Sequence, residues 1–154
     1  MRTQRGFTLV ELMVVVLLTT TLLGFATISL VRSQQGISLT SVEEILVADL
    51  RQQQLKAMIG DTEGRASSDF YGIHFDSNRY VLFHGTTYSS LDASNSIINL
   101  QNNMQFNNSN YDVIFSKLSG TTSATIVELN DNTSSKLKRI HLNIFGVVNQ
   151  VESL

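Results

Sequence analysis

An apolar run of 25 residues, from Phe7 to Val31, places the strongest constraint on what this chain can fold into. Its one ionisable side chain is that of Glu11. The hydrocarbon core of a bilayer is about 30 Å thick and requires roughly 20 apolar residues in a helix. At about 1.5 Å per residue, this run would extend over roughly 37 Å. The run therefore predicts a helix that can cross a membrane with some tilt.

The carboxylate of Glu11 does not prevent the insertion of this helix. The run contains 15 Leu, Ile, Val or Phe residues, and each favours insertion by about 0.3 to 0.6 kcal/mol. Their sum of roughly 4.5 to 9 kcal/mol exceeds the roughly 2.5 to 3.5 kcal/mol that one carboxylate costs at the bilayer centre. Because an ionisable group inside a membrane span predicts a functional site, Glu11 is a candidate functional residue.

The motif Gly6-Phe7-Thr8-Leu9-Val10-Glu11 lies between a short basic leader and the apolar run. In this arrangement it resembles the prepilin signal of type IV pilins and type II secretion pseudopilins. The resemblance implies that a prepilin peptidase cuts after Gly6 and N-methylates the new terminus, Phe7. It also implies that Glu11 of one subunit neutralises the Phe7 α-amine of a neighbour during assembly. The partners implied are the peptidase, other pilins or pseudopilins, an inner-membrane platform protein and membrane lipid.

Two other interpretations of the N-terminal segment account for fewer of its features. An ordinary secretory signal has a shorter apolar core that ends in small residues of the A-x-A kind, and neither Thr19-Thr20-Thr21 nor Ala26-Thr27 makes a convincing cleavage site. A plain signal anchor for an extracytoplasmic binding domain explains the apolar run, but not the spacing of Glu11 from Gly6. The signal-anchored binding domain remains an alternative, as does a DNA-binding minor pilin for DNA uptake.

We expect four segments: a leader (1–6), a transmembrane and assembly helix (7–31), a soluble half of that helix (32–60) and a β-rich domain (61–154). The resemblance implies one pass through the cytoplasmic membrane, with the N-terminus in the cytoplasm and the domain outside, before entry into a pilus or pseudopilus. Loss of Arg2 and Arg5 with the leader leaves nine basic against 13 acidic residues, a net charge of −4. This charge argues against a general nucleic-acid binder.

Beyond the apolar run, the residue pattern predicts an α+β fold. One helix is expected to end near Gly60, with apolar residues at helical spacing on its buried face: Val42, Ile45, Leu46, Leu50, Leu55, Met58 and Ile59. The period then changes to two, which is typical of strands. We expect strands at 71–75, 80–83, 97–106, 111–115, 124–129, 140–144 and 147–151. Short connections between them favour an antiparallel sheet against which the long helix packs.

The later chain resembles, more weakly, the minor pseudopilins of the H type and related minor pilins. The resembling segments are Asp49-Leu50-Arg51, Tyr71-Gly72-Ile73, Tyr80-Val81-Leu82-Phe83, the stretch 114–120 and the stretch 140–148. These are sheet patterns that many β-rich domains share.

The remaining polar residues give little indication of catalysis or of a cofactor. No glycine-rich phosphate loop, nucleophile elbow or paired-acid motif is present in the sequence, so we expect no enzymatic activity and no cofactor. His74, His84 and His141 have no carboxylate at metal-ligand spacing, and Asp61, Glu63 and Asp69 are too loosely spaced for an EF-hand. We therefore expect no metal site.

One basic cluster, formed by Lys136, Lys138, Arg139 and His141, could contact the phosphates of DNA. No aromatic residue that could stack on bases interleaves with these charges. The favoured interpretation is instead a solvated strand face opposite Leu137, Ile140 and Leu142.

Overall fold

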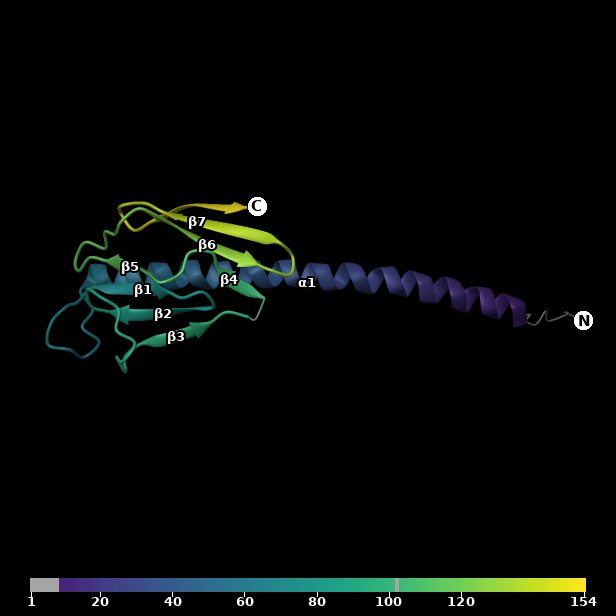
Figure 1. Ribbon diagram of the computed structural model, residues 1–154, viewed down its shortest axis with the longest axis horizontal. Coiled ribbons are helices and arrows are strands. Elements are labelled where there is room, and N and C mark those ends of the chain that lie inside the picture. The colour runs from purple at the N-terminus through teal and green to yellow at the C-terminus, as the bar shows by residue number, and fades with distance from the viewer. Residues whose placement is uncertain (1–8, 102) are drawn as a thin grey trace, which may run out of the picture. The chain divides into compact units, whose positions relative to one another are not determined.

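The computed structural model describes residues 9–101 and 103–154, and within α1 it describes the side chains of 9–23 and 39–59. One helix is followed by eight strands in this part of the chain (Figure 1). The elements are α1 (Leu9–Ile59), β1 (Tyr71–Phe75), β2 (Arg79–His84), β3 (Ser96–Asn99), β4 (Met104–Phe106), β5 (Tyr111–Phe115), β6 (Thr125–Asp131), β7 (Lys136–Leu142) and β8 (Val148–Ser153). The predicted α+β class is confirmed.

The strands form two antiparallel sheets, where the sequence predicted one. The first has the order β3-β2-β1-β5 and the second the order β4-β6-β7-β8. The expected single strand over 97–106 is wrong, because β3 pairs with β2 in the first sheet and β4 pairs with β6 in the second. In Figure 1 the two sheets lie along the second half of α1. Both contribute side chains to a single hydrophobic core.

The second half of α1 enters this core through one face. Its buried apolar residues are Leu39, Leu46, Val47, Leu50 and Ala57. Spacings of three and four residues keep most of them on one side of the helix. They pack with inward-facing residues of both sheets, among them Tyr71, Ile73 and Phe75 of β1, Val127 and Leu129 of β6, and Ile140 and Leu142 of β7.

The predicted helical face is only partly correct. Leu46 and Leu50 are buried and Val42 packs against the core. Four of the predicted residues are instead exposed to solvent by 48% or more: Ile45, Leu55, Met58 and Ile59. From Leu50, steps of three and four residues lead to Gln53 and Ala57, so the buried face continues through a polar and a small residue.

The C-terminal end of α1 is fixed by the backbone and by one glutamine. Gly60 adopts a φ of +67°, and the amides of Gly60 and Asp61 donate to the carbonyls of Ala57 (3.2 Å) and Lys56 (2.9 Å). This pattern is the Schellman motif, which requires a left-handed residue, and it agrees with the predicted stop at Gly60. Gln54 Nε2 donates to the carbonyls of Gly120 (3.2 Å) and Phe145 (2.6 Å).

Truncation of Leu46 tests the observed buried face. Leu46 is fully buried, and we expect Leu46→Ala to lower the free energy of unfolding by about 2 to 5 kcal/mol, since burial is lost and a cavity remains. Leu55→Ala is the matched control, because Leu55 is 57% exposed and should change the stability by about 0.5 kcal/mol or less. Urea denaturation of the fragment 38–154 measures both values. Equal effects would contradict this assignment of the helix faces.

The chain divides into two compact units, residues 1–37 and 38–154. The core, both sheets and the second half of α1 belong to the second unit. The N-terminal motif belongs to the first.

Candidate functional site

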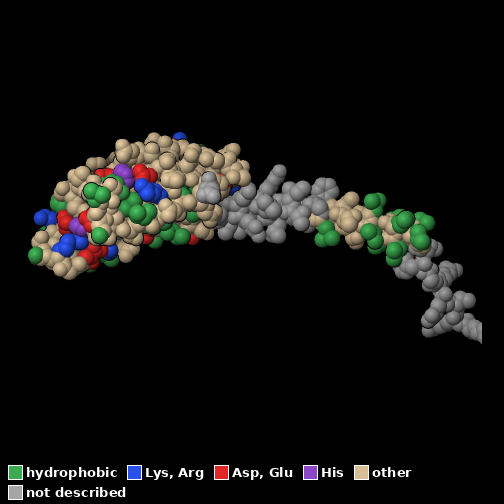
Figure 2. Space-filling model, turned by 60° about the horizontal axis from the view of Figure 1, so that its bottom comes forward, with side chains coloured by type: hydrophobic (Ala, Val, Ile, Leu, Met, Phe, Trp, Pro, Cys, Tyr) green, Lys and Arg blue, Asp and Glu red, His purple; other side chains and the backbone are tan. Residues whose placement is uncertain are grey.

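In the first unit, the described side chains of α1 are apolar and exposed over several turns. From Leu9 to Leu23 every residue is exposed, and the large apolar side chains reach 72% exposure at Leu9 and 68% at Leu22. Figure 2 shows these hydrophobic side chains gathered on this segment of the helix. A helix that is apolar on all sides is normally covered by lipid or by other protein. This segment therefore requires a covering partner.

The three consecutive threonines of this segment have their hydroxyls bonded within the helix. The Oγ1 atoms of Thr19, Thr20 and Thr21 donate to the carbonyls four residues earlier, at distances of 2.9, 2.7 and 3.1 Å. Each also lies within 3.0 Å of the carbonyl three residues earlier. Because these hydroxyls are bonded inside the helix, none requires water as a partner.

Glu11 lies in the first turn of α1 as the structure describes it, at an exposed position. The predicted cleavage site, Gly6 and Phe7, lies outside the described residues.

Across the residues that the structure describes, no helix combines the length and apolarity needed to cross a membrane. The membrane span predicted for 7–31 lies only partly within the described structure. Residues 7 and 8 are outside the described residues, and from position 24 to 31 only the backbone is described.

The basic cluster does not form one surface. Strand residues alternate between the two faces of a sheet, so Lys138 of β7 shares a face with Ile140, whereas Arg139 points the other way. The Nζ atom of Lys138 lies 2.8 Å from Glu43 of α1. The Nε atom of Arg139 lies 2.6 Å from Glu128 of β6. Both cations are thus neutralised within the domain. The expected solvated face opposite Leu137, Ile140 and Leu142 is wrong, because Lys136 and Lys138 lie on the same side of β7 as Ile140 and Leu142. Lys136 is exposed.

Two histidines of the first sheet each lie between two carboxylates. His74 Nδ1 is 2.6 Å from Asp112 and its Nε2 is 3.3 Å from Asp76. His84 Nδ1 is 3.0 Å from Asp69, and its Nε2 is 3.3 Å from Oδ2 of Asp92. Although burial alone would raise the pKa of Asp69, hydrogen bonds from His84 and the Phe70 amide hold it below its usual range.

Sequence reasoning missed these pairings. The pairing of His74 with Asp112 follows from the strand register, which places His74 of β1 opposite Asp112 of β5. Among the described residues, no group of three His, Asp or Glu side chains could hold a metal ion.

The comparison with protein families identifies the N-terminal segment. Residues 1–27 match the prokaryotic N-terminal methylation motif. The chain carries the signal of type IV pilins and pseudopilins. Comparison with curated proteins and with solved structures gives no match. This pilin-type signal marks a membrane-anchored precursor that prepilin peptidase processes and that assembles with other pilins. The α+β fold, with its N-terminal helix and two antiparallel sheets, is consistent with a pilin-like protein.

Proposed function

We propose that the chain is a structural subunit of a type IV pilus or of a type II secretion pseudopilus. Prepilin peptidase cuts after Gly6 and methylates Phe7, and the apolar helix over 7–31 anchors the mature chain in the cytoplasmic membrane. The N-terminus lies in the cytoplasm and the α+β domain outside. An inner-membrane platform protein then moves the subunit into the filament. The role is structural, without catalysis.

The observation that carries this proposal is the match of residues 1–27 to the methylation motif. Two features of the structure support it. The exposed apolar side chains between Leu9 and Leu23 need lipid or other helices around them. In the second unit, the solvent face of α1 carries Ile45, Leu55 and Ile59, each more than half exposed. Such a stripe suits contact with a neighbouring subunit.

Within this class we propose a minor subunit related to the H-type pseudopilins, on the basis of the weaker resemblance in segments such as Tyr71-Gly72-Ile73. A DNA-binding minor pilin receives less support. Lys138 and Arg139 are both paired with carboxylates of the same domain, so less positive charge is available to phosphates at this place.

Intact-mass measurement of the membrane form tests the proposal. With a prepilin peptidase co-expressed, we expect a chain that starts at Phe7 and is heavier by one methyl group. Without the peptidase, the chain should keep residues 1–6. The processed form should also be found in the sheared filament fraction when the other pilins are present. A chain that still starts at Met1 beside active peptidase would favour the plain signal anchor instead.

A further inference from the structure

A polar cleft in the second unit lies between α1 and the first sheet. Its volume is about 390 Å³, within the range of small-molecule sites. On α1, Asp49, Gln53 and Lys56 recur at intervals of four and three residues, which places them on the same side of the helix. The opposite wall comes from β2 and β3, where the register places Leu82 across from Ser96. We name this space the helix–sheet cleft.

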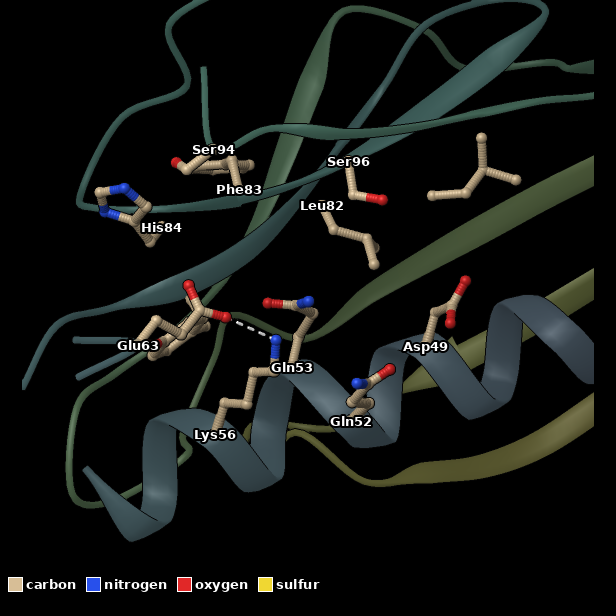
Figure 3. Close-up of a pocket in the computed structure, with 12 residues that line it drawn as sticks. Asp49, Gln52, Gln53, Lys56, Glu63, Leu82, Phe83, His84, Ser94 and Ser96 are labelled. Carbon is tan, nitrogen blue, oxygen red and sulfur yellow. Dashed lines mark hydrogen bonds and ion pairs between the residues drawn. The ribbon is translucent and has the colours of Figure 1, made fainter. Parts of the chain in front are cut away.

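Gln53 is a buried polar residue of the helix–sheet cleft. Its side chain is 2% exposed, and within the described part of the chain its Oε1 atom has no hydrogen-bond partner. Figure 3 shows the amide between the Lys56–Glu63 pair and Asp49, with the side chains of β2 and β3 across the space. A buried acceptor without a partner destabilises a fold, whereas an apolar side chain of similar shape would not. The Oε1 atom of Gln53 therefore needs a donor from a molecule in the cleft, which an ordered water or a bound ligand can supply.

Lys56, the one Lys or Arg among the described lining residues, is already paired. Lys56 Nζ lies 2.6 Å from Glu63 Oε1, and its hydrogen bond lowers the pKa of Glu63. Asp49 Oδ2 accepts a hydrogen bond from the hydroxyl of Tyr80 at 2.6 Å, and because this donor is neutral, Asp49 keeps its negative charge. His84 has its nitrogens directed at Asp69 and Asp92. No cation of the lining is therefore left to bind an anionic group such as a phosphate.

The other polar groups of the lining suit hydroxyls. Gln53 and Asp49 offer acceptors, and the hydroxyl of Ser96 can either donate or accept. The hydroxyl of Ser94 already donates to Asp92 at 2.7 Å, so it offers the ligand an acceptor. A ligand hydroxyl would satisfy Gln53 in either orientation of its amide, because it is both a donor and an acceptor. Leu82 and Ile98 add apolar surface for the C–H face of a ring. We propose that the helix–sheet cleft binds a small uncharged ligand rich in hydroxyl groups, of the size of one saccharide unit.

The binding test uses the full chain in a zwitterionic detergent without a sugar headgroup. The probes are D-glucose, D-galactose and N-acetyl-D-glucosamine, with inorganic phosphate and spermidine as charged comparisons, and binding is followed by NMR titration. At least one sugar should bind. Failure of all three sugars, or binding of phosphate or spermidine alone, would overturn the proposal. The test does not depend on filament assembly, so its result is separate from that of the proposed function.

Two substitutions locate the binding site. Gln53→Met removes both polar atoms and should weaken sugar binding about tenfold or more, without lowering the midpoint of thermal unfolding. Ser96→Trp fills the helix–sheet cleft from exposed β3 and should weaken binding similarly even if Gln53→Met fails to fold. Ser123→Trp, at an exposed position that does not line the cleft, is the matched control and should bind like the wild type. Unchanged sugar binding in Ser96→Trp would overturn the proposal.

Discussion

Replacement of Gly6 by valine is expected to abolish processing and, with it, filament assembly. The prepilin resemblance places Gly6 immediately before the cut. Valine adds a branched side chain beside the peptide bond that must be cut and restricts the backbone conformations that glycine permits. We therefore expect the Gly6→Val chain to remain in the membrane at its full length, with no methyl group at Phe7. Intact-mass measurement of the membrane form detects both changes.

A second substitution in the leader controls for a general effect on membrane insertion. Thr3→Val introduces the same side chain three residues earlier and should be processed normally. Cleaved and methylated Gly6→Val protein would show that the residue before the cut does not control processing in this chain.

Substitution of Glu11 by alanine is expected to have the second-largest effect, on assembly alone. Insertion does not need this carboxylate, and the cleavage site lies several residues earlier, so the variant should be processed and should stay in the membrane. In a bundle of helices, however, the Phe7 amine of a neighbouring subunit would lose its counter-charge. A buried charge without a partner costs on the order of 3 to 5 kcal/mol. This cost corresponds to a loss of incorporation of roughly a hundredfold or more.

Two further variants separate charge from shape at this position. Glu11→Gln keeps the size of the side chain and removes the charge, so it should fail as Glu11→Ala does. Glu11→Asp keeps the charge and should be partly tolerated. The measurement is co-fractionation of each variant with sheared filaments, beside its processing state. Normal incorporation of processed Glu11→Ala and Glu11→Gln would show that the ion pair is dispensable for this subunit.

The helix and the strands could be predicted from residue periodicity, but the division into two sheets could not. The segment 96–106 contains apolar residues that fit one irregular strand. The structure separates it into β3 and β4, which belong to different sheets. Periodicity reports which residues face a core. It carries no information about which distant strand supplies the hydrogen bonds, and that pairing determines where a sheet ends.

The buried face of α1 shows a different limit of sequence reasoning. The prediction followed hydrophobicity and so selected Leu55, Met58 and Ile59, which are exposed. The core instead continues through Gln53 and Ala57, both buried at helical spacing from Leu50. A small or polar residue at a core position gives a weak hydrophobic signal. In such a case the spacing of three and four residues is the better guide.

For the basic cluster, the alternation of strand residues was available from the sequence. Lys138 and Arg139 are adjacent, so they point to opposite faces of any strand. Their carboxylate partners were not available, because Glu43 lies in the helix and Glu128 in a neighbouring strand. For the pairings of His74, likewise, the strand register had to be known first.

The internal hydrogen bonds of Thr19, Thr20 and Thr21 affect the free energy of transferring this helix segment from a bilayer to a bundle of protein helices. Each hydroxyl carries its acceptor with it on the same helix. If the segment leaves a bilayer and enters a bundle of protein helices, no hydrogen bond at these positions has to be broken or replaced. The polar atoms of the threonines therefore add little to the free-energy difference between the two surroundings. The free energy of transfer in either direction then depends on how well the apolar side chains pack against lipid and against neighbouring helices.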